Sequence, residues 1–351
     1  RRASGEDRSP FHAHFVPPFA LPRIGDDGLR GPTVTPTVAG RSGLVGKLKG
    51  RAEYLPVPSS SPSFAAFDAW LSTSIEWAGS RAGPSWPECF ARGAAHGFVF
   101  RAPGSTPNEL LCGAIAPSRD QAGRQFPLAL ATPLRLPPEL LARPELLPFV
   151  LEGVWGDTTR ALLAALSTGE PEQASDFELQ PITDIAEAAA LYDDWAARLP
   201  LVELWALLGP ALNEPESALR LLLETLSPVR GEEPAETTLS VRLPLGLASG
   251  LGLCFWLDVV RRSLSWQRTI PSLFWSHDGR DGAVMLALGK APASTLAELW
   301  LPTGRCDDIA DLALPVSPPL VGLLSPLPAS MRAALFAREA TVASFLESAG
   351  R

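Results

Sequence analysis

The sequence predicts an α/β protein of the α+β type: an antiparallel sheet with flanking helices, arranged as two α/β units joined by an acidic helical segment. Three short apolar runs at 97–102, 110–117 and 127–134 are bounded by Gly, Pro or Asn, and the short loops between them favour an antiparallel meander. A helical repeat of apolar residues precedes them at 63–78, and a second set of strands and helices follows at 237–305.

Changes in local composition and in the pattern of apolar residues divide the chain into five predicted segments. Prolines are too frequent near both ends for long helices or central strands. We expect a Pro- and Gly-rich flexible arm at 1–42, a first α/β unit at 43–136, a mostly helical acidic segment at 137–236, a second strand–helix unit packing with the first at 237–305, and a Pro-rich tail with a terminal amphipathic helix at 306–351.

The first predicted helix is amphipathic. Ser63 is its expected N-cap and Gly79 lies beyond its expected end. Its apolar stripe consists of Phe64, Phe67, Trp70, Leu71 and Ile75.

The middle of the chain is acidic. Between residues 170 and 238 there are fifteen Asp and Glu against three Arg. Asp184 and Glu187 have the spacing of a capping box at the start of a helix. The charge is typical of a solvated helix face, and the alternative is a docking surface for a basic partner.

The second unit has its own strand and helix signals. Residues 238–245 alternate as a strand does, and residues 253–264 carry a helical stripe. Two Asp-Gly pairs within 277–282 predict a hairpin, and Ser294 is the expected N-cap of the helix after it.

Composition excludes several classes of partner. The formal net charge of −8 and the isoelectric point near 5.2 argue against nucleic acid and anionic membranes. The four Cys have no C-x-x-C spacing, which favours reduced thiols in a cytoplasm. No apolar run is long enough to span a bilayer, and Arg1 and Arg2 precede polar residues, so we expect no signal peptide.

Most templates for catalysis fail. Gly46-Lys47 suggests a P-loop, but Leu48 stands where Ser or Thr should bind Mg²⁺. Ser249 is one position late for a nucleophile elbow. His12 and His14 lack a third ligand, and no Cys or His elsewhere has zinc spacing. We therefore expect no enzyme activity, cofactor or metal.

The ten tryptophans have two interpretations. Trp70, Trp195, Trp256 and Trp275 fall on apolar stripes or strands, which favours core packing. The alternative is a peptide groove lined by tryptophan.

The segment GAIAPSRDQAGRQFPLAL at 113–130 resembles the signature of the TagF (ImpM) family of type VI secretion-associated proteins. That signature is an apolar strand, Pro-Ser-x-Asp-x-x-Gly-Arg-x-Phe-Pro-Leu, and a second strand. Upstream, GLVGKL at 43–48 and FDAWL at 67–71 resemble two further motifs of the family, so the resemblance covers about 43–134. The signature residues in register are Pro117, Ser118, Asp120, Gly123, Arg124, Phe126, Pro127 and Leu128.

The chain departs from the family pattern in three places, one of which is Phe98-Val99-Phe100, where the family has Trp-Arg-Phe. Where the family has Arg-Gly-Asp-Phe, this sequence has Arg51-Ala52-Glu53-Tyr54, and the lost Gly argues against a tight backbone approach there. Phe67 stands where the family has Trp.

The resemblance implies a fold and a function. The family fold is an antiparallel sheet with flanking helices. The family's members are cytoplasmic, non-enzymatic bacterial regulators that restrain type VI secretion after translation, acting with a scaffold protein that carries a forkhead-associated domain. Some relatives are fused to a PP2C-type phosphatase, whose metal-binding Asp pattern this chain lacks.

Two interpretations of the signature loop remain. An Asp120–Arg124 ion pair braces the turn, with a side-chain bond from Ser118 closing it. Alternatively, Arg119 and Arg124 face outward and bind an acidic or phosphorylated segment of a partner. The candidate partner-binding or motif residues are Pro117, Ser118, Arg119, Asp120, Gly123, Arg124, Phe126, Pro127, Gly46, Lys47, Asp68 and Trp70.

Two rival functions belong to other classes. A longin- or roadblock-like adaptor would bind a small GTPase or serve as an assembly scaffold, which rests on fold analogy. A hydrolase would use Cys89 or Ser249, but no motif positions a base beside either residue.

Overall fold

One sheet runs through both predicted α/β units. The computed structural model describes residues 34–55, 61–174, 182–231, 237–276, 282–300, 306 and 308–350. Its nine strands are β1 (Thr37–Val38), β2 (Gly43–Gly46), β3 (His96–Phe100), β4 (Glu109–Ala116), β5 (Leu128–Arg135), β6 (Ser240–Pro244), β7 (Ser272–Ser276), β8 (Ala283–Ala287) and β9 (Ile309–Asp311).

The sheet is antiparallel except at one edge. Its order is β1-β5-β4-β3-β7-β8-β6-β9, and β2 also pairs with β5. Only β6 and β9 pair in parallel among the described strands. The expected β3-β4-β5 meander is present, and the antiparallel sheet with flanking helices is confirmed. β3 pairs with β7, with Phe98 opposite Phe274, so this ladder joins the two units.

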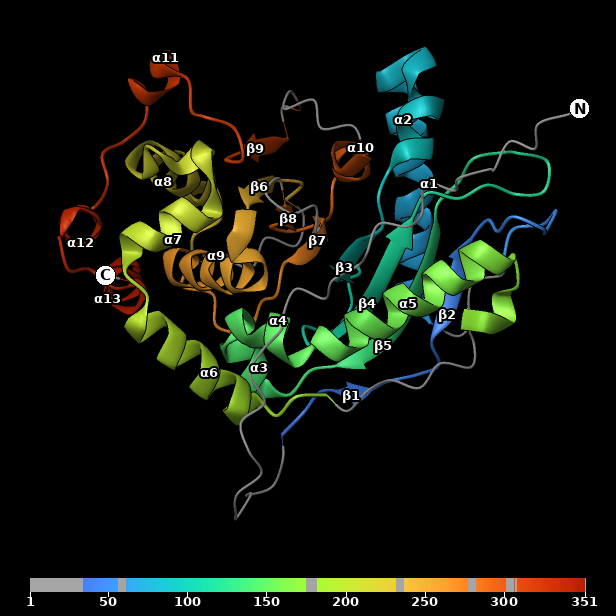
Figure 1. Cartoon of the computed structure of the whole chain (residues 1–351), viewed down its shortest axis with the longest axis horizontal. Coiled ribbons are helices and arrows are strands. Elements are labelled where there is room, and N and C mark those ends of the chain that lie inside the picture. The colour runs from blue at the N-terminus through green and yellow to red at the C-terminus, as the bar shows by residue number, and fades with distance from the viewer. Residues whose placement is uncertain are drawn as a thin grey trace, which may run out of the picture.

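Helices cover both faces of the sheet (Figure 1). One face carries α1 (Pro62–Ala82), α2 (Trp86–Arg92) and α10 (Ser294–Trp300). The other carries α3 (Pro138–Ala142), α4 (Leu147–Val150), α5 (Glu152–Thr168), α6 (Ile185–Arg198), α7 (Leu201–Leu208), α8 (Pro215–Leu226), α9 (Ser249–Leu264), α12 (Ala329–Phe336) and α13 (Val342–Ala349). A short helix, α11 (Pro318–Val321), precedes α12.

Burial on both faces explains why the strands read as nearly continuous apolar runs. Successive side chains of a strand point to opposite faces. In β7, Phe274 packs in the core under α1 and α10, whereas Leu273 and Trp275 pack in the core under α9. β3 alternates in the same way, with Phe98 on one side and Val99 on the other. Each face therefore needs its own layer of helices.

Helix boundaries differ from the sequence expectations at two places. Helix α1 begins at Pro62 with Ser61 as N-cap instead of Ser63, because proline is favoured in the first turn. It also continues through Gly79 and ends at Gly83, which has the positive φ of 55° that glycine tolerates. The expected terminal helix is two helices, α12 and α13, and Thr341 caps the second with a capping box.

Other expectations are met or lie outside the described residues. Asp184 caps α6 by accepting the backbone N–H of Ala186 at 2.8 Å. The strands that flank the hairpin turn predicted at 277–282, β7 and β8, pair antiparallel with Ser276 opposite Ala283. The turn itself lies outside the described residues apart from Gly282, and so do residues 1–33 of the predicted arm. Within the described part of the chain, no helix has the length and apolar character needed to cross a membrane.

A buried histidine makes the fold sensitive to acid. His96 is fully buried beside Trp300, and the backbone of Trp275 opposes the effect of burial only in part. Burial lowers its pKa from 6.5 to about 4, so protonation favours the unfolded chain. Above pH 6.5 His96 is neutral in both the folded and the unfolded chain and costs no stability. As the pH falls from 6.5 toward 4, the unfolded chain binds the proton first, so the free energy of unfolding decreases.

We expect the free energy of unfolding to be lower at pH 5 than at pH 7.5, with His96 accounting for about 2 kcal/mol of the difference. Urea unfolding at both pH values, compared with a His96→Phe variant, measures this part. An identical pH dependence in both proteins would contradict the assignment to His96.

Candidate partner-binding site at the 117–127 loop

The signature loop, residues 117–127, connects β4 to β5 as a narrow backbone hairpin. The Phe126 N–H donates to the Ser118 carbonyl at 3.1 Å, and the Asp120 N–H donates to the Arg124 carbonyl at 3.1 Å. The turn passes through Gly123, whose φ of +82° is in the region that glycine adopts without strain. The loop therefore has a defined shape before any partner binds.

Asp120 is the internal brace of this loop. Its buried carboxylate accepts the Arg124 backbone N–H at 2.8 Å and the Arg124 Nε–H at 2.6 Å, and lies 3.4 Å from Lys47 Nζ. Burial acts to raise the pKa of Asp120, but the hydrogen bonds from Arg124 and Lys47 outweigh it and lower the pKa to about 2. The expected Asp120–Arg124 ion pair is present.

A second segment, the facing turn at residues 47–55, supports the loop from the side. The Gln121 N–H donates to the Arg51 carbonyl at 2.9 Å, and Arg124 Nη2 donates to the Ala52 carbonyl at 3.1 Å. Although the family's Gly is replaced by Ala52, its carbonyl still reaches the loop. The two segments form one surface, here called the signature-loop surface (47–55 and 117–127).

Gly46 sets how closely the facing turn approaches. Its φ is +123°, and a Cβ at this position would lie 1.9 Å from the Pro127 carbonyl oxygen. The next residue, Lys47, donates its backbone N–H to that same carbonyl at 3.3 Å. A side chain at position 46 would therefore separate the two segments. The Gly46-Lys47 pair has this packing role here.

Two further candidate residues, Asp68 and Trp70, lie in different surroundings. The Tyr54 hydroxyl donates to Asp68 on α1, and the Tyr54 ring packs edge-on against Phe126 at 5.3 Å. Burial, together with the Asp68 carboxylate, raises the pKa of Tyr54 well above its usual value. Trp70 is instead a core residue: it stacks on Phe274 at 4.8 Å and donates to the Pro292 carbonyl at 3.2 Å.

Tyr54 was not among the residues selected from the sequence. The available signal was its place in the 51–54 segment, where the family has Phe. The added hydroxyl joins the facing turn to α1 through Asp68.

The expectation that a Ser118 side-chain bond closes the turn was wrong. The Ser118 Oγ has no hydrogen-bond partner within the described residues, and the backbone carbonyl of Ser118 makes the closing bond to Phe126 instead. Pro117 is buried close to Gly93, where an added Cβ would lie 2.8 Å from its Cγ.

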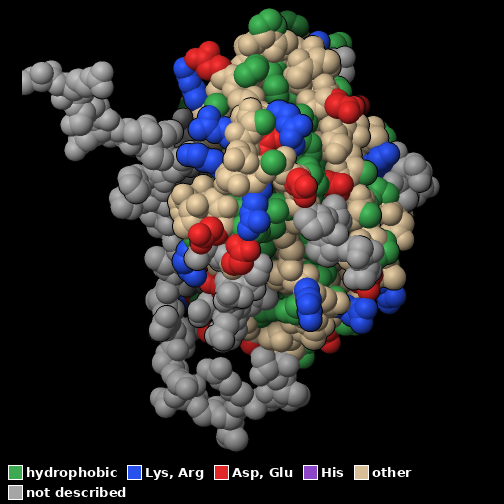
Figure 2. Space-filling view, turned by 90° about the vertical axis from the view of Figure 1, so that its right-hand side faces the viewer, with side chains coloured by type: hydrophobic (Ala, Val, Ile, Leu, Met, Phe, Trp, Pro, Cys, Tyr) green, Lys and Arg blue, Asp and Glu red, His purple; other side chains and the backbone are tan. Residues whose placement is uncertain are grey.

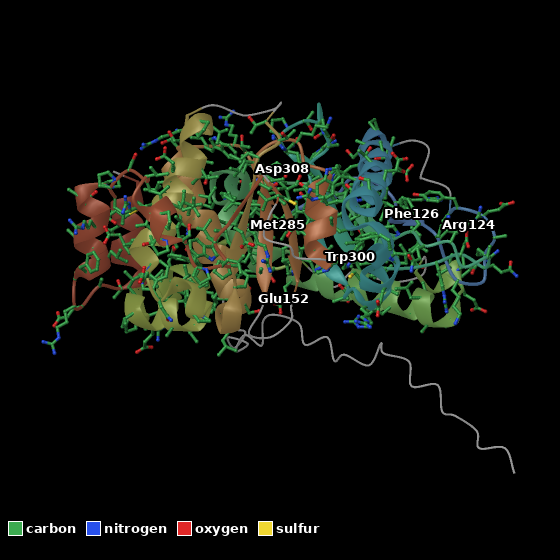
Figure 3. All side chains as sticks on the ribbon, turned by 90° about the horizontal axis from the view of Figure 1, so that it is seen from above. Arg124, Phe126, Glu152, Met285, Trp300 and Asp308 are labelled. Atoms are coloured by element: carbon green, nitrogen blue, oxygen red, sulfur yellow. The ribbon has the colours of Figure 1, made fainter. Side chains whose placement is uncertain are left out.

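The signature-loop surface is cationic in an acidic protein. It contains five Lys and Arg and two acidic residues, whereas the whole chain has a net charge of −8. Figure 2 faces this end of the molecule and shows Lys and Arg side chains along the middle and one side of the face. From above, Arg124 and Phe126 lie together at this end, away from Met285 and Asp308 (Figure 3). The five cations are Lys47, Lys49, Arg51, Arg119 and Arg124.

Three of these cations form ion pairs within the protein, and two do not. Lys47 and Arg124 pair with Asp120, and Arg51 pairs with Glu172 at 3.3 Å. Lys49 and Arg119 are exposed and have no ion-pair partner in the part of the chain that the structure describes. Arg119 is adjacent in the chain to Asp120, whose hydrogen bonds fix the loop, so the backbone that carries the Arg119 side chain is ordered.

The exposed guanidinium of Arg119 has the chemistry to bind an acidic group. A guanidinium on a rigid loop binds carboxylate or phosphate through two parallel hydrogen bonds. The described residues contain no group of three or more His, Cys, Asp or Glu placed to hold a metal ion.

One match to a family model covers the segments that form this surface. Residues 43–182 match the family model of the TagF N-terminal domain, described as type VI secretion system-associated. The crystal structure of PA0076 from Pseudomonas aeruginosa PAO1 is 18% identical, covers 79% of this chain and 98% of that chain, and has a TM-score of 0.40. No curated protein matches the chain. Residues 43–182 are therefore similar to the N-terminal domain of the TagF family, which is described as type VI secretion system-associated.

Proposed function

We propose that the protein is a non-enzymatic cytoplasmic regulator that restrains type VI secretion after translation. It acts by protein–protein contact with a scaffold that carries a forkhead-associated domain. The TagF N-terminal domain supports the association with type VI secretion. The observation that supports this contact is the exposed side chain of Arg119, which is next to Asp120 in the chain. The buried carboxylate of Asp120 accepts two hydrogen bonds from Arg124 and forms an ion pair with Lys47, so it holds the loop in place.

The geometry of the signature-loop surface supports an acidic or phosphorylated partner segment. Asp120 pairs with both Arg124 and Lys47, whereas Arg119 and Lys49 are exposed and have no ion pair within the described residues. Because the backbone around Arg119 is already ordered, little conformational entropy is lost on binding. The bracing and contact interpretations therefore apply to different residues of one loop.

Calorimetric titration with the forkhead-associated scaffold from the same organism tests this function. We expect a Kd in the micromolar range or tighter, and the phosphorylated and unphosphorylated scaffolds together report whether phosphate contributes. Absence of binding to both forms would remove the proposed partner. A complex with a GTP-loaded small GTPase in that case would favour the adaptor function.

The Arg119→Ala variant separates contact from folding. We expect its Tm to stay within about 1 °C of wild type, because an exposed charge without a partner contributes little to stability. Its affinity for the scaffold should fall at least fivefold, as measured by the same titration. The matched control is Arg338→Ala, an exposed arginine far along the chain on the segment after α12, which should bind as wild type. Equal binding by both variants would contradict the assigned surface.

A further inference from the structure

A second cationic surface lies at the opposite end of β5. The signature loop ends where β5 begins, and α3 starts three residues after β5 ends at Arg135. Eight strand residues span about 27 Å. Here a groove of about 590 Å³, the α3–α9 groove, opens between α3 and the segment that follows α9. One wall is formed by Pro138, Leu141 and Ala142, and the other by Arg261, Trp266 and Arg268.

The inner part of this groove is apolar and fixed in shape. Leu141 and Trp266 are buried, and the indole Nε1–H of Trp266 donates to the Val229 carbonyl at 3.3 Å. Pro138 and Ala142 extend the apolar wall of α3 to the surface. A rigid indole beside aliphatic side chains is a suitable contact for one apolar side chain of a ligand.

The polar part of the groove is cationic. Arg261 is held in place by Glu145 Oε2, 3.0 Å from its Nε, and by Asp258 Oδ1, 2.5 Å from its Nη2. These bonds use Nε and Nη2, so the two Nη1 hydrogens remain as donors. Arg268 is exposed and has no ion pair within the described residues. Among the described residues that line the groove there is no Asp or Glu.

We propose that the α3–α9 groove binds an extended segment of a protein partner in which an apolar side chain is followed by Asp or Glu. The apolar side chain enters against Trp266 and Leu141, and the carboxylates meet Arg261 and Arg268. A nucleotide fits less well, because Gln267 supplies the only side-chain acceptor on the described lining, and bases and riboses need acceptors. This site goes beyond the proposed function and does not depend on it.

Fluorescence anisotropy with a labelled hexapeptide, Gly-Phe-Asp-Glu-Asp-Gly, tests the groove on the full chain. We expect saturable binding to wild type. A peptide with Asn and Gln in place of the acids, and a peptide with Ala in place of Phe, should each bind at least tenfold more weakly. Quenching or shift of tryptophan emission on binding of the unlabelled peptide should accompany it, since Trp266 lines the groove.

Two variants place the binding at this groove. Ala142→Glu adds a carboxylate to an exposed helical position of the wall, and Arg268→Glu reverses an exposed charge, so both should fold and both should weaken binding at least tenfold. Arg338→Glu makes the same charge change at an exposed position outside the groove, so this variant should bind the peptide as wild type does.

Three outcomes would overturn the inference. The first is that the peptide does not bind to the wild type. The second is that the groove variants and the Arg338→Glu control bind the peptide with equal affinity. The third is displacement of the peptide by micromolar GTP or ATP with tighter binding of the nucleotide, which would assign the groove to a small anionic ligand. The groove variants that lose peptide binding should still bind the scaffold as wild type does, because Arg119 lies at the other end of β5.

Discussion

Replacing Asp258 with alanine is expected to lower the free energy of unfolding by about 3–5 kcal/mol, because it removes a buried carboxylate that pairs with two partly buried arginines, Arg261 and Arg262. Asp258 lies on α9 and is 1% exposed. It accepts Arg261 Nη2 at 2.5 Å, Arg262 Nε at 2.7 Å and the Tyr192 hydroxyl at 3.2 Å. The change removes all three bonds at once.

The surrounding network makes this loss hard to relieve. Glu145, in the 3₁₀ turn Pro144–Leu146, also binds Arg261 and accepts Arg143 Nε at 2.9 Å. Burial raises the pKa of Glu145, and the charge of Asp258 adds to this. The arginines place positive charge beside two buried carboxylates, and their hydrogen bonds hold α6, α9 and the 144–146 turn together.

Asp193 provides a matched control within the same network. It pairs with Arg143 at 2.7 Å, but its side chain is 60% exposed. We expect Asp193→Ala to cost less than about 1 kcal/mol because solvent screens the pair. Urea denaturation of both variants at pH 7 gives the comparison. Similar losses from Asp193→Ala and Asp258→Ala would show that burial does not decide the energetics here.

Replacing Asp120 with alanine is expected to lower the Tm by about 4–8 °C and to weaken scaffold binding as well. The variant loses the bonds to the Arg124 backbone and side chain and the contact with Lys47. Without them the hairpin around Gly123 keeps only its backbone bonds. Arg119 then lies on a less ordered loop, so affinity falls although Arg119 itself is unchanged.

Acid should abolish the contribution of Asp120 in a defined pH range. Its pKa is lowered from 3.8 to about 2, so its stabilising effect is present above pH 4 and is lost as the pH falls through 2. Differential scanning calorimetry should show the Tm gap between wild type and Asp120→Asn closing between pH 4 and pH 2. A gap that stays constant over this range would exclude a stabilising role for the ionised carboxylate.

The comparison with Arg119→Ala makes the second prediction specific. Asp120→Ala should reduce both Tm and affinity, whereas Arg119→Ala should reduce affinity alone. Equal Tm losses from both variants, with unchanged binding, would make the whole loop structural.

The sequence by itself determined the strands, the helical faces and the family motifs. Alternating and continuous apolar runs identified β3, β4 and β5, because side-chain period and turn residues are local properties. The spacing of Asp120 and Arg124 across Gly123 predicted their ion pair for the same reason. The N-cap of α6 at Asp184 was also readable, since a cap involves residues only two or three apart.

Only the tertiary structure decided which distant residues meet. Asp258 appeared in the sequence as a polar interruption of an apolar run, and its pairing with Tyr192 and two arginines depends on how α6 and α9 pack. Tyr54 and Asp68, the facing turn beneath Arg124, and the groove between α3 and the end of α9 likewise join segments far apart in the chain. Such contacts follow from burial and packing of whole layers, which no local pattern encodes.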